Sequence, residues 1–86
     1  MQIMVQLEAS LARAMREGTP ASHAIRDAAA RAGVTLRPAH PTVSDPPLST
    51  WFTAELRDGD VPRALAALRP LPGVTAAYAK PQDALP

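Results

Sequence analysis

Residues 49–69 read STWFTAELRDGDVPRALAALR, a strand pattern followed directly by a helix pattern. In residues 49–57 apolar and more polar positions alternate, and this period of two predicts a half-buried strand. One face of that strand carries Phe52, Ala54 and Leu56, and the other carries Trp51, Thr53, Glu55 and Arg57. Asp58-Gly59 then turns the chain, and Asp60 is expected to cap a helix. The apolar stripe of this helix consists of Val61, Ala64, Leu65 and Leu68.

The N-terminal half repeats the order of strand and helix. Residues 2–8 alternate, with Ile3, Val5 and Leu7 on one face and Gln2, Met4, Gln6 and Glu8 on the other. Residues 10–17 follow a helical pattern that stops at Gly18, which predicts a helical turn inserted before the main helix. Thr19 is expected to cap that helix, with Pro20 at its first position. Its apolar stripe is formed by Ile25, Ala28, Ala29 and Ala32.

Two further strands and a tail complete the chain. Residues 34–42 contain Pro38 and Pro41, which cannot donate to a strand ladder, so this strand belongs at a sheet edge. Residues 74–79 form a final short strand. Residues 80–86 contain two prolines and predict an extended tail.

The order strand, helix, strand, strand, helix, strand predicts an α+β fold of the ferredoxin-like βαββαβ type. Short connections and right-handed crossovers close it as a two-layer sandwich, a four-stranded antiparallel sheet with both helices on one face. The first and third strands are expected in the centre of the sheet. We therefore expect a single domain over residues 1–79 and an extended tail over residues 80–86.

This arrangement leaves one face of the sheet uncovered. The residues expected on this docking face are Met4, Gln6, Trp51, Thr53, Glu55 and Tyr78. An exposed tryptophan beside a methionine on a flat sheet is typical of an interaction surface. The alternative is that Trp51 only covers neighbouring backbone, since scattered exposed aromatic side chains are common.

Composition excludes several classes of protein. The 86 residues include no cysteine, which rules out disulfides, thiolate metal sites and thiol nucleophiles. Nine basic and eight acidic residues give a formal net charge of +1 without a dense basic run, so no nucleic-acid partner is expected. No apolar run approaches the length of a membrane span, and the chain does not start with a signal-peptide pattern. We expect no membrane partner and a cytoplasmic location for the chain as written, or an extracellular one if it is a trimmed piece of a secreted precursor.

No catalytic or metal-binding constellation stands out. His23 and His40 fall in different elements without an acidic residue at ligand spacing, which indicates solvated surface histidines. The four glycines stand alone, so there is no phosphate-binding loop. An RNA-binding sheet would carry aromatic residues on both central strands, whereas the first strand offers Met4 and Gln6. We expect no enzymatic activity, no cofactor and no metal.

Residues 68–86, LRPLPGVTAAYAKPQDALP, resemble the C-terminal part of the propeptide domain of subtilisin-type serine proteases, which also occurs as a free-standing proteinase inhibitor. The matching residues are Pro72, Gly73, Val74, Ala77 and Tyr78, followed by residues 79–86. The order of elements along the whole chain is similar as well. Lys80 departs from the family, which often carries an acid there, and the chain stops at Leu85-Pro86 rather than at a large residue for the primary pocket.

The resemblance implies an inhibitor and intramolecular-chaperone-type domain of a subtilisin-like protease, acting in cis or in trans. The docking face would pack on two surface helices of the protease, and Asp83 or Glu55 would lie at the N-termini of those helices. The tail would lie in the substrate cleft through Lys80, Pro81, Gln82, Asp83, Ala84, Leu85 and Pro86. The alternative function is a general protein–protein interaction or dimerisation domain, in which the docking face pairs with itself or with a larger protein. A small-molecule-sensing domain is a third alternative, which no residue singles out.

Overall fold

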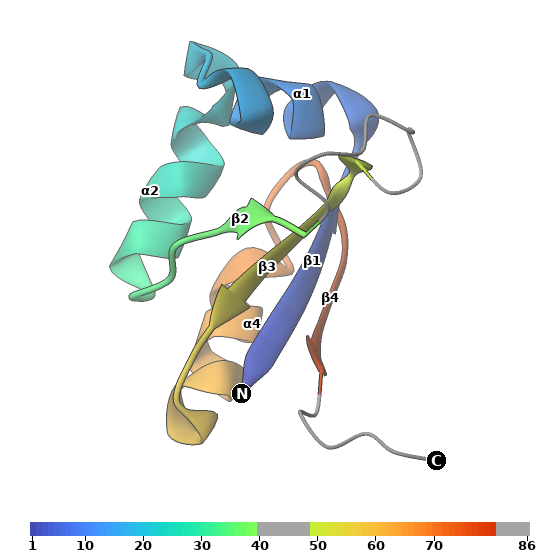
Figure 1. The fold of residues 1–86 in the computed structure, drawn as a ribbon. Coiled ribbons are helices and arrows are strands. Elements are labelled where there is room, and N and C mark those ends of the chain that lie inside the picture. Colours follow the sequence, from blue (N-terminus) through green and yellow to red (C-terminus); the bar gives the residue numbers. More distant parts are fainter. Residues whose placement is uncertain (40–48, 81–86) are drawn as a thin grey trace.

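The computed structural model describes residues 1–39 and 49–80, and the four strands in these ranges form one antiparallel sheet. The strands are β1 (Gln2–Leu7), β2 (Arg37–Pro38), β3 (Trp51–Glu55) and β4 (Val74–Lys80). Their order across the sheet is β2-β3-β1-β4, so β1 and β3 are central (Figure 1). The ferredoxin-like α+β sandwich predicted from the sequence is confirmed.

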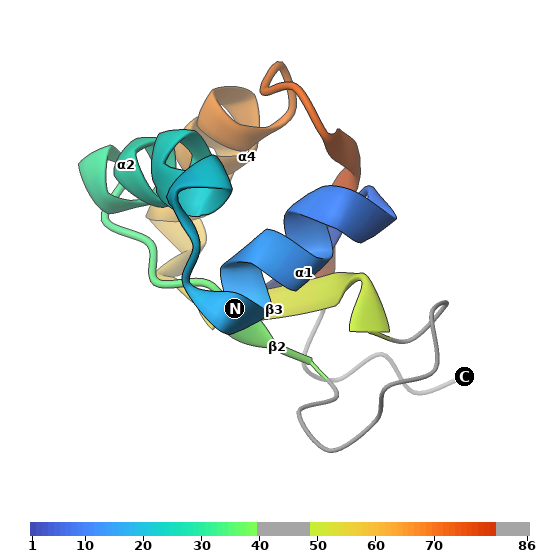
Figure 2. The ribbon, with the colours of Figure 1, turned by 90° about the horizontal axis from the view of Figure 1, so that it is seen from above.

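The helices of the described chain lie on one side of this sheet. They are α1 (Ala9–Glu17), α2 (His23–Arg31) and α4 (Val61–Leu68). Short 3-10 turns at Pro20–Ser22 and Asp58–Asp60 lead into α2 and α4. Figure 2 shows α2 and α4 side by side, with α1 crossing one end of the sheet. The other face of the sheet carries no helix from the described ranges, and we call it the open face.

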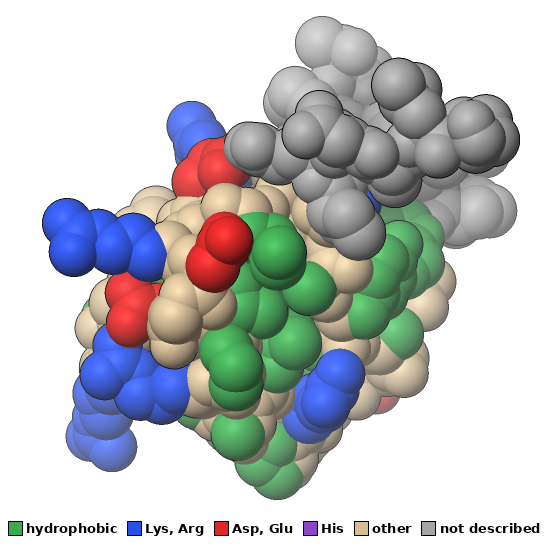
Figure 3. All heavy atoms as spheres, turned by 90° about the horizontal axis from the view of Figure 1, so that it is seen from below, with side chains coloured by type: hydrophobic (Ala, Val, Ile, Leu, Met, Phe, Trp, Pro, Cys, Tyr) green, Lys and Arg blue, Asp and Glu red, His purple; other side chains and the backbone are tan. Residues whose placement is uncertain are grey.

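Charges of both signs occur together on the face of the molecule that Figure 3 shows. Seen from the end of the molecule at which β1 begins, most charged side chains lie on one side and hydrophobic side chains lie in the middle (Figure 3). Arg63 on α4 forms an ion pair with Asp60, with its Nη2 atom 3.3 Å from Oδ1. Such a mixture differs from the single-sign basic stripe on which nucleic-acid binding depends.

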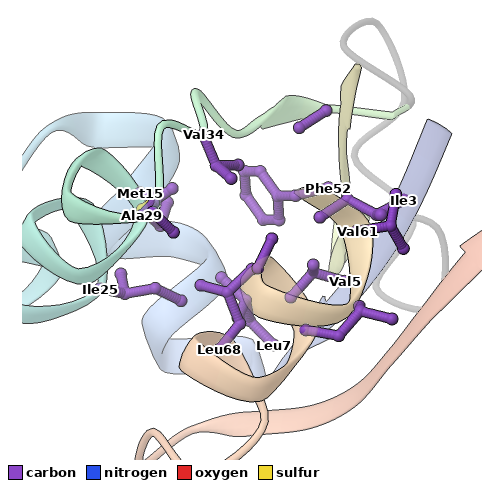
Figure 4. Close-up of a cluster of buried hydrophobic side chains, with 14 of the residues drawn as sticks. Ile3, Val5, Leu7, Met15, Ile25, Ala29, Val34, Phe52, Val61 and Leu68 are labelled. Atoms are coloured by element: carbon purple, nitrogen blue, oxygen red, sulfur yellow. The ribbon is translucent and has the colours of Figure 1, made fainter. Parts of the chain in front are cut away.

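The hydrophobic core fills the space between the sheet and the helices. Alternate residues of β1 and β3 point into it, and the largest of them, Phe52, is 1% exposed. Figure 4 shows side chains from the helices converging on the same space. The labelled core side chains are Ile3, Val5, Leu7, Met15, Ile25, Ala29, Val34, Phe52, Val61 and Leu68. Burying a large apolar side chain stabilises a fold by about 1.5–3 kcal/mol, so these residues hold the two layers together.

Helix α1 is fastened at both ends. At its start, the backbone N–H of Glu8 donates to the carbonyl oxygen of Gly73 over 2.8 Å. Near its end, the guanidinium of Arg26 on α2 donates to the carbonyl oxygen of Met15. Arg26 Nε also donates to the buried hydroxyl of Ser22 over 2.9 Å. These bonds join α1 to the turn before β4 and to α2. The sequence predicted only a helical turn at the position of α1.

Strand β4 forms one edge of the sheet. Arg69 directly follows α4, and its Nε atom donates to the carbonyl oxygen of Ala77 on β4 over 3.1 Å. The end of α4 is therefore tied to the edge strand.

The two predicted helix caps were wrong in their chemistry. Thr19 and Asp60 do precede helical turns, but neither side chain makes a capping hydrogen bond. The carbonyl oxygen of Thr19 accepts instead from the N–H and the hydroxyl of Ser22, because the chain enters α2 through a 3-10 turn. Asp60 already has helical backbone angles, and its carboxylate pairs with Arg63.

Two predicted boundaries also differ from those observed. Strand β2 has two residues rather than spanning 34–42, and residues 40–42 lie outside the described ranges. Lys80, predicted as the first residue of the tail, is the last residue of β4 and pairs with Gln2. The rest of the predicted tail, residues 81–86, lies outside the described ranges.

Candidate functional site

The strand register gathers the six predicted docking residues on the open face. Ile3, Val5 and Leu7 are buried, so the alternate residues of β1 point away from the core. Pairing with β3 and β4 then arranges the open face in three rows. From β3 through β1 to β4 these rows are Glu55–Gln2–Lys80, Thr53–Met4–Tyr78 and Trp51–Gln6–Ala76. We call these nine residues the docking face.

Two aromatic rings meet on this face. Trp51 and Tyr78 lie on strands separated by β1, and their ring centroids are 5.9 Å apart at an interplanar angle of 78°. This edge-to-face geometry is a favourable aromatic contact. Tyr78 is 45% exposed, the one exposed large hydrophobic side chain among the described residues. The rings therefore form a fixed apolar ridge across the central strand.

The polar side chains of the central strand are already hydrogen-bonded within the sheet. Gln2 Nε2 donates to Thr53 Oγ1 over 2.6 Å, and Thr53 Oγ1 donates to the carbonyl oxygen of Ile3 over 3.1 Å. The amide of Gln6 links β4 to the residue before β3, because its Nε2 donates to Thr50 Oγ1 over 3.4 Å and its Oε1 accepts from Thr75 Oγ1 over 3.1 Å. Partners fix these groups in place, so a docking protein need not order them.

The docking face has one acidic side and one basic side. Glu55 on β3 and Lys80 on β4 flank Gln2 in the same row. Two strand spacings, about 10 Å, separate their backbones. None of the ion pairs in the described chain joins these two side chains. Glu55 lies 4.0 Å from the ammonium group of Met1, which is closer, at 3.5 Å, to Asp58.

Sequence reasoning missed three members of the open side of the sheet, and one of them, Lys80, was assigned to the tail. Arg37 on β2 pairs with Thr53 and extends the middle row beyond β3. Ala76 on β4 lies opposite Gln6. Leu36 is partly buried, so alternation places Arg37 on the open face. The proline that follows made the strand hard to recognise in the sequence. Ala76 gave no signal because alanine occurs on both faces of β4.

The helix side offers a pocket but no evident chemistry. A hollow of about 400 Å³ lies between α1, the start of α2 and the turn before β4, lined mainly by apolar side chains. His23 is exposed on α2, and His40 lies outside the described ranges. Within residues 1–39 and 49–80 there is no group of three metal-ligating side chains and no buried side-chain polar atom that lacks a hydrogen bond. No helix in these ranges is long and apolar enough to cross a membrane.

No protein family, curated protein or solved structure matches this chain.

Proposed function

We propose that this chain is a non-catalytic docking module that binds another protein through its docking face. The observation that carries the proposal is the edge-to-face pair of Trp51 and Tyr78 on a face that no helix of the described ranges covers. Aromatic side chains dominate the energetics of protein interfaces, and rigid ones lose little conformational entropy on binding. The glutamine amides beside the rings support the same function. They already have hydrogen-bond partners, so the burial of the rings would contribute most of the free energy of binding.

The partner class that we propose is a subtilisin-type serine protease, which the chain would inhibit in cis or in trans. The resemblance in residues 68–86 suggests this class. The fold is compatible with it, because a flat sheet can pack on two surface helices and β4 ends on the docking face at Lys80. Residues 81–86 would then continue into the substrate cleft, where an extended segment adds main-chain hydrogen bonds to the edge of the cleft.

Inhibition of subtilisin by the purified chain tests this function. We expect slow, tight inhibition by the full chain and loss of inhibition by a chain that ends at Lys80. Trp51→Ala should weaken inhibition by about 10-fold or more, because a central aromatic anchor is removed. His23→Ala is the matched control on the helix side and should leave inhibition unchanged.

Equal inhibition by the full chain and by the chain that ends at Lys80 would refute the role of the tail. If neither Trp51→Ala nor Tyr78→Ala weakened inhibition, the docking face would not be the binding surface. A full chain that leaves subtilisin active at every concentration would remove this protease as the partner.

A further inference from the structure

We infer that the docking face also binds a second copy of this chain, as a face-to-face dimer whose two-fold axis runs along β1. The inference rests on the proposed function, because it names one occupant of the same face. Its evidence is the distribution of charge over the three rows and the position of the aromatic rings over β1. No helix from the described ranges covers this face, so it is available for contact in both copies.

A two-fold axis that runs between two copies, parallel to their sheets, brings the docking face of one copy against the docking face of the other. One such axis runs along the central strand, and the other runs across the strands. Both axes pack two sheets of the same twist on each other, so the twist of the sheet does not favour either axis. The side chains that are brought together differ, and they distinguish the two arrangements.

With the axis along β1, each row lies over the same row of the second copy with its two sides exchanged. Glu55 then faces Lys80 of the second copy, and Lys80 faces Glu55. Two symmetric ion pairs form at one end of the interface. With the axis across the strands, Glu55 would face Trp51 and Lys80 would face Ala76, so neither charge would meet an opposite charge of the second copy. Charge complementarity therefore selects the first axis.

The aromatic rings lie on the same axis. Trp51 has its backbone opposite Ala76 of the second copy, but its ring meets Tyr78 over β1, so the ring pairs of the two copies pack on each other at the axis. Met4 lies in the middle row on the axis and faces its own counterpart. Methionine suits the centre, because its flexible side chain fills irregular gaps.

The overlap is small, and this sets the expected strength. Rotation about β1 carries β2 beyond β4 of the second copy, so Arg37 stays outside the interface. Three strands at a spacing of about 4.8 Å and five or six residues each give a face of about 14 by 18 Å. Two such faces bury about 500 Å² in total, well below the roughly 1,200 Å² at which standard specific interfaces begin, so we expect a weak dimer with a dissociation constant on the order of 100 μM or weaker. Such a dimer can release its face to a tighter partner.

Charge reversal tests the dimer. Sedimentation of the full chain from about 10 μM to about 1 mM should show dimers that increase with concentration. Glu55→Lys gives a face with two lysines and Lys80→Glu a face with two glutamates, so each variant alone should associate at least about 10-fold more weakly, because like charges oppose each other. An equimolar mixture of the two should form heterodimers, because each lysine then faces a glutamate. The double variant E55K/K80E should dimerise like the original chain. Circular dichroism checks that these exposed substitutions leave the fold intact.

A second variant tests size without changing charge. Ala76→Trp should block the dimer, since a third bulky ring on each face would hold the two sheets apart, while a strand position outside the core tolerates the ring in the monomer. A chain that stays monomeric at about 1 mM overturns the inference, as does a mixture that associates no more tightly than its components. A dimer that both single charge variants retain also overturns it, since pairing through the edge of β4 would not bring Glu55 to a partner. If subtilisin inhibition persists and still depends on Trp51 in a monomeric chain, the docking function stands without the dimer.

Discussion

Gly73 and Leu11 lie so close together that the turn before β4 has no room for a side chain at position 73. A Cβ atom added to Gly73 would lie 2.5 Å from Cδ2 of Leu11 on α1. The φ angle of Gly73 is +89°, in the region that favours glycine. The carbonyl oxygen of the same glycine accepts a hydrogen bond from the backbone N–H of Glu8, the residue before α1. One residue thus sets both the turn and the approach of the inserted helix.

Gly73→Ala should therefore destabilise the domain by about 2–3 kcal/mol, because it adds backbone strain and displaces Leu11. Gly18→Ala has a similar strain at φ +70° but open space around the added Cβ, so about 1 kcal/mol is expected. Gly59→Ala has neither cost and should stay within about 0.5 kcal/mol of the original. Urea unfolding followed by circular dichroism gives the free energy of unfolding of all three variants. Equal losses of stability would show that the contact with Leu11 does not contribute.

Neighbouring residues on β3 should differ sharply in their effect on stability. Phe52→Ala empties the centre of the core and should cost about 3–5 kcal/mol, enough to unfold a domain of this size. Trp51→Ala removes one ring from the open face and should cost about 1 kcal/mol, mainly the contact with Tyr78. Thermal unfolding of both variants tests this difference, and a Trp51 effect as large as that of Phe52 would mean that the open face is part of the core.

Arg26→Met should loosen α1 from α2. The substitution keeps an unbranched apolar stem but removes the donors to Met15 and to the buried Ser22, so about 1–2 kcal/mol of stability should be lost. Hydrogen exchange in α1 should increase more than exchange in β1. Arg13→Met on the exposed side of α1 is the control, and a change of less than about 0.5 kcal/mol is expected there. Equal effects of the two variants would contradict the role of Arg26.

The single tryptophan provides a direct probe of the docking face. Tyr78→Ala removes the ring that packs against Trp51, so the fluorescence emission of Trp51 should shift to longer wavelength as water reaches the indole. Quenching by acrylamide should increase with it. Thr35→Ala, at an exposed position beyond the sheet, should leave both signals unchanged. An emission maximum unaltered by Tyr78→Ala would show that the two rings do not shield each other in solution.

The sequence was a good guide to the sheet because burial on one side imposes a strict alternation on each central strand. That alternation identified Ile3, Val5 and Phe52 as buried and put Met4 and Trp51 on the opposite face. Proline placement correctly made β2 an edge strand. Right-handed connections between these elements then left one strand order, which is the order observed.

Details that depend on tertiary contacts were not accessible in the same way. A threonine or aspartate before a helix predicts a cap, but Thr19 and Asp60 make other bonds because the chain enters both helices through 3-10 turns. The contact between Trp51 and Tyr78 joins strands that are not neighbours, so no local pattern could reveal it. The opposite charges in one row became visible only from the register, which placed Lys80 in β4.

The bond from Arg69 to Ala77 has a consequence for how this protein can grow into assemblies. Exposed strand edges template the addition of further strands, and such addition has no natural end. Here a guanidinium already engages a main-chain acceptor of β4, so an incoming strand would have to displace it. Association through the flat side of the sheet instead consumes that side in both molecules, and it stops at two.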